Sequence, residues 1–233
     1  MSPNNILNMA MLKELNIIAV TDHNSCLQLD VIEELKESYE MLIIPGVEVE
    51  VKEKYHVVCL FKTFDIARKF QKALSIYLSR RMHDEEIYGE QNLFDAFDDI
   101  ISNYQISLMG SSNIALLDLK KIVKGLDGIL ILAHIEKYSS DIFDKLKTVY
   151  CNVFDAIEVN ANYDISKIND KIKDLSYLIF RNSDAHQIMD ISEPVNFIEL
   201  EELSIEALFE KIKGGKSNGW FITPHFRCCD KFV

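Results

Sequence analysis

The sequence predicts an α/β fold in which mostly parallel strands alternate with helices, as in a barrel. Short apolar runs alternate with amphipathic segments at the spacing of βα units. Four of these runs also end at or beside side chains that commonly bind metals. These side chains belong to Thr21-Asp22-His23, Glu48, His134 and Ser183-Asp184-Ala185-His186. Because the carboxyl ends of barrel strands meet on one face, we expect the four segments to form one polynuclear metal centre.

The first part of the chain is expected to supply three helices and three strands. Ser2 suits the N-cap of the first helix, and Pro3 suits its first turn, where no N–H partner is needed. Apolar residues at helical spacing predict helices over residues 3–15, 27–39 and 64–78. Apolar runs predict strands over residues 17–21, 41–51 and 55–61, the second of them broken at Pro45-Gly46.

Residues 80–110 interrupt this alternation. Two short apolar stretches flank an acidic turn there, which suggests an inserted hairpin or a lid. The alternation then resumes, and the predicted helices cover residues 116–123, 141–149, 165–175 and 204–212. The predicted strands of this part cover residues 128–133, 156–160, 177–180 and 195–200. Since no repeat or linker-like segment is present, we expect residues 1–233 to form a single domain.

The composition narrows the class of protein and its surroundings. Of the 233 residues, 48% are hydrophobic, but no apolar run approaches the ~20 residues that a membrane span needs. No basic segment precedes an apolar one at the N-terminus, so we expect neither a signal peptide nor a membrane partner. The five cysteines lack zinc-finger spacing and indicate reduced thiols in the cytoplasm.

The charge balance bears on possible substrates. A net charge of −12 argues against nucleic acid as a partner, because binding to its phosphates needs a basic surface. The same charge is compatible with a small phosphorylated substrate, since bound divalent ions reverse the sign of the local field. We therefore expect a small phosphate ester rather than a nucleic-acid strand.

Six residues are candidate metal ligands: His23, Glu48, His56, His134, Asp184 and His186. Neutral imidazoles and carboxylates can hold divalent ions and leave coordination positions open. Glu48 follows a Pro-Gly pair, where its carboxylate could bridge two cations. Asp184 and His186 are two residues apart in extended backbone and should point the same way. We assign catalytic roles to Asp22, Glu48 and His134, with Asp22 orienting a neighbouring group by hydrogen bonds.

Five short motifs resemble those of the PHP (polymerase and histidinol phosphatase) family, in the same order over nearly the whole chain. They are Thr21-Asp22-His23-Asn24, Pro45-Gly46-Val47-Glu48, His56, Ala133-His134 and Ser183-Asp184-Ala185-His186. The resemblance, to the small free-standing phosphoesterase branch, implies a distorted (β/α)7 TIM-like barrel. It also implies two or three divalent ions, such as zinc, manganese or iron, and hydrolysis of phosphate esters by a metal-activated hydroxide.

The resemblance further implies how the ligands are shared. One metal site would use Glu48, His56 and His134. A second would use Asp184 with Glu48 bridging, and a third would use His23 and His186.

The chain departs from the family at its first motif, a strand that carries His-x-His. The sequence has no such strand before the helix that starts at Ser2-Pro3, so the barrel is expected to lack its first strand. Either translation begins upstream of Met1, or the chain is a truncated paralogue. The alternative to an enzyme is accordingly a degenerate, non-catalytic scaffold that binds metal or phosphate. An exonuclease-type activity is a third interpretation, which the acidic charge balance disfavours.

Three arginines are candidate substrate-binding residues: Arg80, Arg81 and Arg181. Guanidinium groups can bind two phosphate oxygens at once, although ordinary solvated charges are the alternative for all three. The adjacent Cys228-Cys229 pair is expected to be a surface pair, against a redox or metal-binding role. The sequence predicts neither the identity of the substrate nor the oligomeric state.

Overall fold

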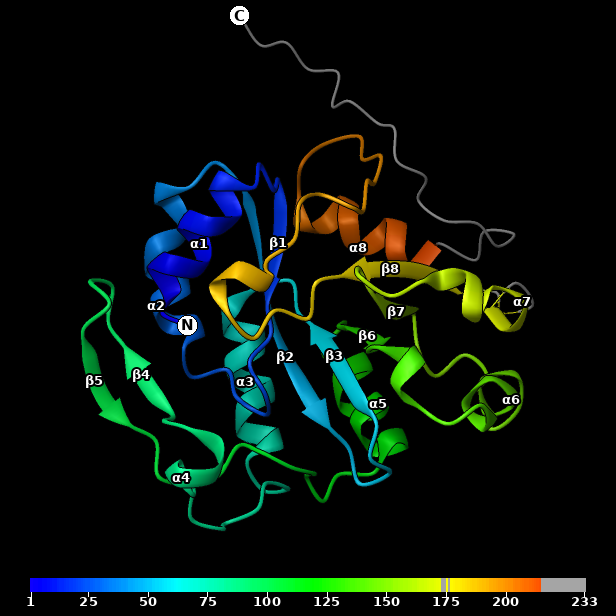
Figure 1. The fold of residues 1–233 in the computed structure, drawn as a ribbon, viewed down its shortest axis with the longest axis horizontal. Coiled ribbons are helices and arrows are strands. Elements are labelled where there is room, and N and C mark those ends of the chain that lie inside the picture. Colours follow the sequence, from blue (N-terminus) through cyan, green and yellow to red (C-terminus); the bar gives the residue numbers. More distant parts are fainter. Residues whose placement is uncertain (173–174, 176, 215–233) are drawn as a thin grey trace, which may run out of the picture.

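The computed structural model describes residues 1–172, 175 and 177–214. At its centre is a six-stranded sheet that curls into part of a barrel, with helices around its outer side (Figure 1). The strands occur in chain order: β1 (Ile17–Val20), β2 (Leu42–Glu50), β3 (His56–Leu60), β6 (Ile129–Leu132), β7 (Ala156–Asn160) and β8 (Leu178–Asn182). The α/β class and the partial TIM-like barrel predicted from the sequence are confirmed. Among the described residues, β1 and β8 are the two edges of this sheet.

The helices and short turns connect these strands. The helices are α1 (Pro3–Leu12), α2 (Leu29–Leu35), α3 (Phe64–Leu74), α4 (Glu85–Tyr88), α5 (Leu116–Gly125), α6 (Asp141–Lys147), α7 (Asn169–Ile172) and α8 (Ile205–Gly214). The 3-10 turns are η1 (Lys36–Ser38), η2 (Ile135–Lys137), η3 (Ile165–Lys167) and η4 (Ile188–Asp190). Helix α3 shows how they pack: Thr63 caps its N-terminus by accepting from the Ile66 N–H, and Phe70 and Leu74 are fully buried against the sheet. None of the described helices combines the length and the apolar character needed to cross a bilayer.

Strand β3 runs antiparallel to both of its neighbours, whereas β1–β2, β6–β7 and β7–β8 are parallel pairs. A tight turn joins β2 to β3, in which the Val51 N–H donates to the Tyr55 carbonyl at 2.9 Å. As a result, the first residue of β3, His56, lies opposite Glu50 at the carboxyl end of β2. Because β3 is reversed, its first residue, His56, lies at the same end of the sheet as the carboxyl ends of the parallel strands.

The expected break of the second strand at Pro45-Gly46 is wrong, because β2 is continuous from Leu42 to Glu50. Residues up to Pro45 pair with β1, and residues from Gly46 onward pair with β3. Pro45 thus lies where the β2–β3 ladder ends, and its missing N–H removes no hydrogen bond from within that ladder. The Pro45 carbonyl still accepts from the Phe61 N–H at 2.9 Å.

The strand expected over residues 195–200 is also wrong, since these residues form neither a strand nor a helix. The side chain of Asn196 takes the place of a strand partner for β8. Its Oδ1 accepts from the Arg181 N–H, and its Nδ2 donates to the Arg181 carbonyl, both at 2.8 Å. The helix expected over residues 165–175 is reduced to η3 and α7, and part of its expected last turn lies outside the described residues. The Cys228-Cys229 pair lies entirely outside the described residues.

Residues 80–110 contain α4 and a separate two-stranded antiparallel sheet of β4 (Asn92–Phe94) and β5 (Ile100–Asn103). This hairpin lies beside α1 and α2 (Figure 1). The Gln28 side chain ties it to the start of α2: Nε2 donates to the Phe94 carbonyl, and Oε1 accepts from the Phe94 N–H, both at 2.9 Å. The side chain of Asn4 in α1 donates to the Ala96 carbonyl at 2.6 Å.

Candidate metal centre

Glu48 is the hub of the candidate centre. It lies near the end of β2 with only 7% of its surface exposed, and both neighbouring histidines reach the same carboxylate oxygen. His56 Nδ1 lies 2.6 Å from Glu48 Oε1, and His134 Nε2 lies 3.3 Å from it. A buried carboxylate between imidazoles is a donor set that suits zinc, manganese or iron.

The electrostatics of this pair follow from the same contacts. Burial alone would raise the pKa of Glu48, but the hydrogen bonds to His134 and His56 and the nearby His23 hold it well below its usual range. Burial would lower the pKa of His56, yet the hydrogen bond and charge of Glu48 raise it above the usual value. The contact with Glu48 therefore favours the protonated form of His56.

His23 enters the centre because the chain continues alongside β2 after β1 ends. The Glu48 N–H donates to the Asp22 carbonyl at 3.1 Å, and the Asn24 N–H donates to the Glu48 carbonyl at 2.8 Å. His23 is thereby bridged to Glu48 in parallel register. Potential ligand atoms of His23, Glu48 and His56 all lie within 4.8 Å of one another, so these three side chains could hold one ion. Burial lowers the pKa of His23, which favours the neutral, ligating form of the imidazole.

His134 follows β6 in a left-handed backbone conformation, with a φ of 35°, and leads directly into the η2 turn. Its Nε2 faces Glu48, while its Nδ1 is buried without a hydrogen-bond partner among the described residues. An unpaired polar atom in the interior is costly unless a ligand satisfies it. Tyr138 supports the neighbouring position, because its hydroxyl oxygen accepts from the His56 N–H at 2.7 Å.

Asp184 and His186 reach the centre from the segment after β8. Asp184 has a φ of 51°, and its side chain is only 10% exposed. Lys137 Nζ donates to its Oδ2 at 2.7 Å. The ring of His186 lies 5.9 Å from that of His23, centroid to centroid, and its Nδ1 is 3.9 Å from Asp184 Oδ1. All six candidate ligands thus gather at one end of the sheet, although only His23, Glu48 and His56 have ligand atoms close enough to share one ion.

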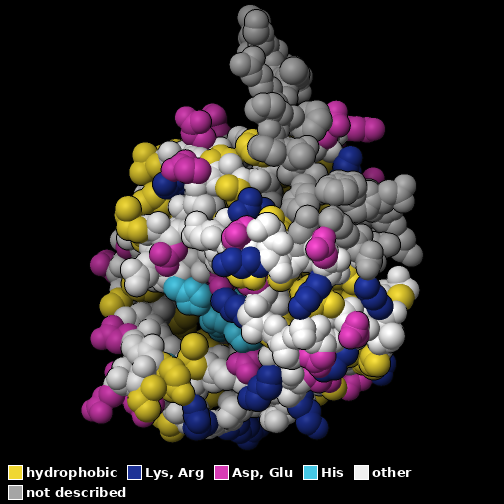
Figure 2. Space-filling view, turned by 45° about the vertical axis from the view of Figure 1, so that its right-hand side comes forward, with side chains coloured by type: hydrophobic (Ala, Val, Ile, Leu, Met, Phe, Trp, Pro, Cys, Tyr) yellow, Lys and Arg dark blue, Asp and Glu magenta, His cyan; other side chains and the backbone are white. Residues whose placement is uncertain are grey.

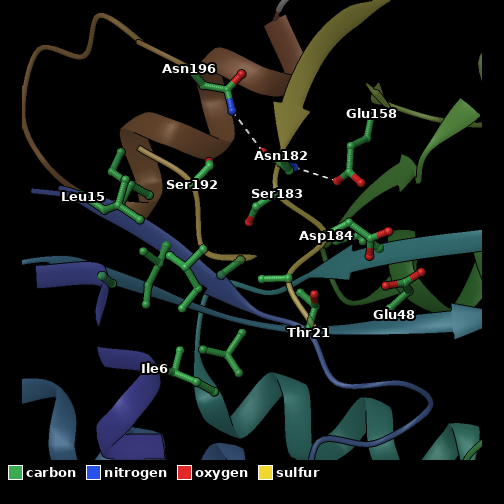
Figure 3. Close-up of a pocket in the computed structure, with 18 of the residues that line it drawn as sticks. Ile6, Leu15, Thr21, Glu48, Glu158, Asn182, Ser183, Asp184, Ser192 and Asn196 are labelled. Carbon is green, nitrogen blue, oxygen red and sulfur yellow. Dashed lines mark hydrogen bonds between the residues drawn. The ribbon is translucent and has the colours of Figure 1, made fainter. Parts of the chain in front are cut away.

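A cavity of about 470 Å³ lies between the edge strands β1 and β8, with the centre at one end. Figure 3 shows Glu48 and Asp184 at this polar end, whereas Ile6 and Leu15 line the opposite, apolar end. From outside, the histidines are visible in a hollow with basic side chains close by (Figure 2). Asp22 is exposed and lines this cavity, and desolvation by the surrounding protein raises its pKa.

The three candidate arginines divide into two groups. Arg181 lines the cavity from β8; one of its guanidinium nitrogens donates to the Ala161 carbonyl, and its buried Nε has no partner among the described residues. Arg80 and Arg81 are exposed residues between α3 and α4, and they do not line the cavity. Only Arg181 is therefore in a position to meet a molecule in the cavity.

Sequence reasoning missed Glu158 as a site residue. It lies on β7, is 5% exposed and lines the cavity. Its Oε2 accepts from Asn182 Nδ2 at 2.6 Å, and Asn182 Oδ1 accepts in turn from Asn196 Nδ2 at 3.0 Å (Figure 3). Burial raises the pKa of Glu158 to about 7. The signal was a single carboxylate inside the apolar run 156–159, because a buried acid without a role is costly.

Comparison with known proteins shows similarity in structure rather than in sequence. No protein-family model and no curated protein sequence matches the chain. A lesion-specific endonuclease from Pyrococcus furiosus superposes with a TM-score of 0.63 and 20% identity, covering 92% of this chain and 51% of that one. An amidohydrolase from Chromobacterium violaceum, solved with bound sulfate, gives a TM-score of 0.62 and 13% identity over 91% and 92% of the two chains.

A third similar structure is a two-domain protein from Bacteroides vulgatus, described as containing a "predicted PHP-like metal-dependent phosphoesterase". It has a TM-score of 0.52 and 14% identity over 92% of this chain and 58% of that one. The chain has a PHP-type fold. The fold implied by the five sequence motifs is therefore confirmed.

The comparisons correct the expectation that nucleic acid is not a partner. The endonuclease from Pyrococcus furiosus has the same fold, and an Endonuclease Q structure in complex with a 27-mer duplex carrying an abasic lesion matches with a TM-score of 0.57. Proteins with the PHP-type fold thus act on DNA, and the exclusion based on net charge is wrong. The chain spans about half the length of these endonuclease chains.

Proposed function

We propose that this chain hydrolyses phosphate esters with the help of bound divalent ions. The observation that carries the proposal is the buried Glu48 carboxylate, which meets His56 and His134 at 2.6 and 3.3 Å and shares a ligand cluster with His23. The lowered pKa of His23, which favours its neutral, ligating form, fits a cation at this cluster. The PHP-type fold adds support, because proteins of this fold include metal-dependent phosphoesterases.

The residues of the cavity have separate tasks in this proposal. Glu48, His23 and His56 would hold zinc, manganese or iron, with His134 beside Glu48, and the ion would supply Lewis-acid chemistry and lower the pKa of bound water. Arg181, on the cavity wall, would orient the phosphate by its guanidinium group. Asp22 faces the cavity with a raised pKa and would accept or donate a proton near the reacting ester.

Two classes of phosphate ester are candidates. The cavity of about 470 Å³ is in the size range of pockets for small molecules, which suits a phosphorylated metabolite or nucleotide. The similarity to lesion-specific endonucleases favours a phosphodiester in damaged DNA. The centre would serve either class, since the same cation and guanidinium bind the phosphoryl oxygens of monoesters and diesters.

The test is phosphate release and strand cleavage by the purified chain with Mn²⁺ or Zn²⁺. An aryl phosphate, a nucleotide panel and a duplex with one abasic site cover the candidate substrates. Glu48→Gln should abolish turnover, whereas Arg80→Ala, outside the cavity, should leave it unchanged. Tight metal binding without turnover of any of these substrates would instead support the non-catalytic scaffold.

A further inference from the structure

Lys137 is a cationic side chain in direct contact with one of the candidate ligands, Asp184. It is the last residue of the η2 turn, and its N–H donates to the His134 carbonyl at 2.9 Å. This turn folds the lysine back over the centre, where its Nζ lies 2.7 Å from Asp184 Oδ2. The side chain of Lys137 is 52% exposed and that of Asp184 is 10% exposed. The ion pair therefore links a partly solvated lysine to a nearly buried carboxylate.

The pairing changes what Asp184 can do. Its Oδ2 is engaged by the ammonium, and its Oδ1 faces His186 Nδ1 at 3.9 Å. Its oxygens also lie outside the cluster of ligand atoms that His23, Glu48 and His56 form. Of the candidate ligands, Glu48 and Asp184 are buried or nearly buried carboxylates, but among the described residues only Glu48 belongs to a cluster close enough to share a divalent ion. The negative charge of Asp184 is balanced from within the chain.

We propose that Lys137 acts as a tethered cation of this centre, neutralising Asp184 and taking the place of a second divalent ion. The chain then binds one divalent ion tightly, at Glu48 and its histidines. The lysine supplies the second positive charge beside it, as a point charge that can also reach phosphoryl oxygens at the rim. This inference rests on the proposed function, because it requires a metal centre at Glu48.

The experiment measures Mn²⁺ binding to the metal-free full chain, by electron paramagnetic resonance of the unbound ion and by calorimetry. Lys137→Met removes the ammonium, Lys137→Arg keeps a cation, and Lys121→Met removes a lysine from an exposed pair with Asp118 on α5. We expect one tight ion in the wild type, in Lys137→Arg and in Lys121→Met. In Lys137→Met, a second ion should bind about tenfold more tightly than in the wild type, because Asp184 becomes available as a ligand.

The outcomes separate the inference from the proposed function. If Lys137→Met binds Mn²⁺ with the same number of ions and the same affinities as the wild type, the tethered-cation role is refuted while the metal centre stands. Two equally tight ions in the wild type would refute it as well. If the wild type binds neither Mn²⁺ nor Zn²⁺, the proposed function fails and the inference fails with it. A circular-dichroism melt of each variant checks that the fold is retained.

Discussion

Replacing Gly46 with alanine should destabilise the chain, because β2 is packed closely on both sides at this residue. An added Cβ would lie 2.7 Å from Thr21 Cγ2, 2.9 Å from Leu60 Cδ2 and 3.2 Å from the Cys59 carbonyl oxygen. Carbon atoms in contact normally sit ~3.5–4.0 Å apart. The Thr21 and Leu60 methyl groups can rotate away, but the carbonyl can retreat only if β3 shifts. Overpacking of this kind costs about 1–3 kcal/mol of unfolding free energy.

Thermal unfolding in EDTA measures this cost without a contribution from metal binding. For a chain of this size, 1 kcal/mol corresponds to roughly 2–4 °C, so Tm should fall by roughly 2–12 °C. Gly125→Ala is the matched control, because a Cβ at the end of α5 would meet no atom within 4 Å. That variant should be unchanged or up to about 1 kcal/mol more stable. A Gly46→Ala chain as stable as the wild type would show that the strands at Thr21 and Leu60 are not packed as described.

Three further predictions concern the acidic residues of the centre. Glu48→Gln should weaken Mn²⁺ binding by at least about tenfold in calorimetry, since the shared anionic ligand is lost; unchanged affinity would place the ion elsewhere. In EDTA, the Glu48–His56 pair should stabilise the fold most between the unfolded-state pKa values of 4.5 and 6.5. The contribution of Glu48, whose pKa is lowered, disappears as pH falls below that window, and the contribution of His56, whose pKa is raised, disappears as pH rises through its folded value. Melts of the wild type and Glu48→Gln across pH should therefore differ most inside the window, and a constant difference would contradict the pairing. Glu158, with its pKa raised to about 7, should cost stability as pH rises, on the order of 3 kcal/mol once it is ionised. Metal-free Glu158→Gln should accordingly be more stable than the wild type at about pH 8 and equal to it at about pH 4, and equal melting temperatures at both would refute the burial argument.

The sequence was sufficient to locate most strands, since a buried strand needs a run of apolar residues wherever it lies in the sheet. It did not reveal the direction of the strand that starts at His56. Only the residues between Val51 and Tyr55 connect it to β2, which is too short for a parallel crossover. That connection length was the available signal for a hairpin. The strand expected over residues 195–200 failed for another reason: a single Asn196 side chain satisfies the backbone that a strand would have paired.

The candidate ligands were also recognisable, because histidine and carboxylate at strand ends form a local pattern. Their partners were not, since they depend on three-dimensional contacts between distant segments. Lys137 meets Asp184 across 47 positions, and Glu158 meets Asn182 across 24. The argument from net charge failed for a related reason. A sum over the whole chain does not describe the field at one site, where Arg181 lines the cavity and Lys137 contacts Asp184.

The chain order of the strands has a consequence for how the centre assembles during synthesis. His23, Glu48 and His56 come from β1, β2 and β3 and their immediate continuations, which are consecutive strands, so only residues 17–60 are needed to bring them together. His134 and Asp184 follow β6 and β8, which are synthesised much later, so these two residues reach the centre after the first three. The three side chains that could share one ion are therefore synthesised before the second half of the sheet. Under the proposed function, an ion could bind as soon as the first three strands have formed, whereas Lys137 can pair with Asp184 only after β8 has docked.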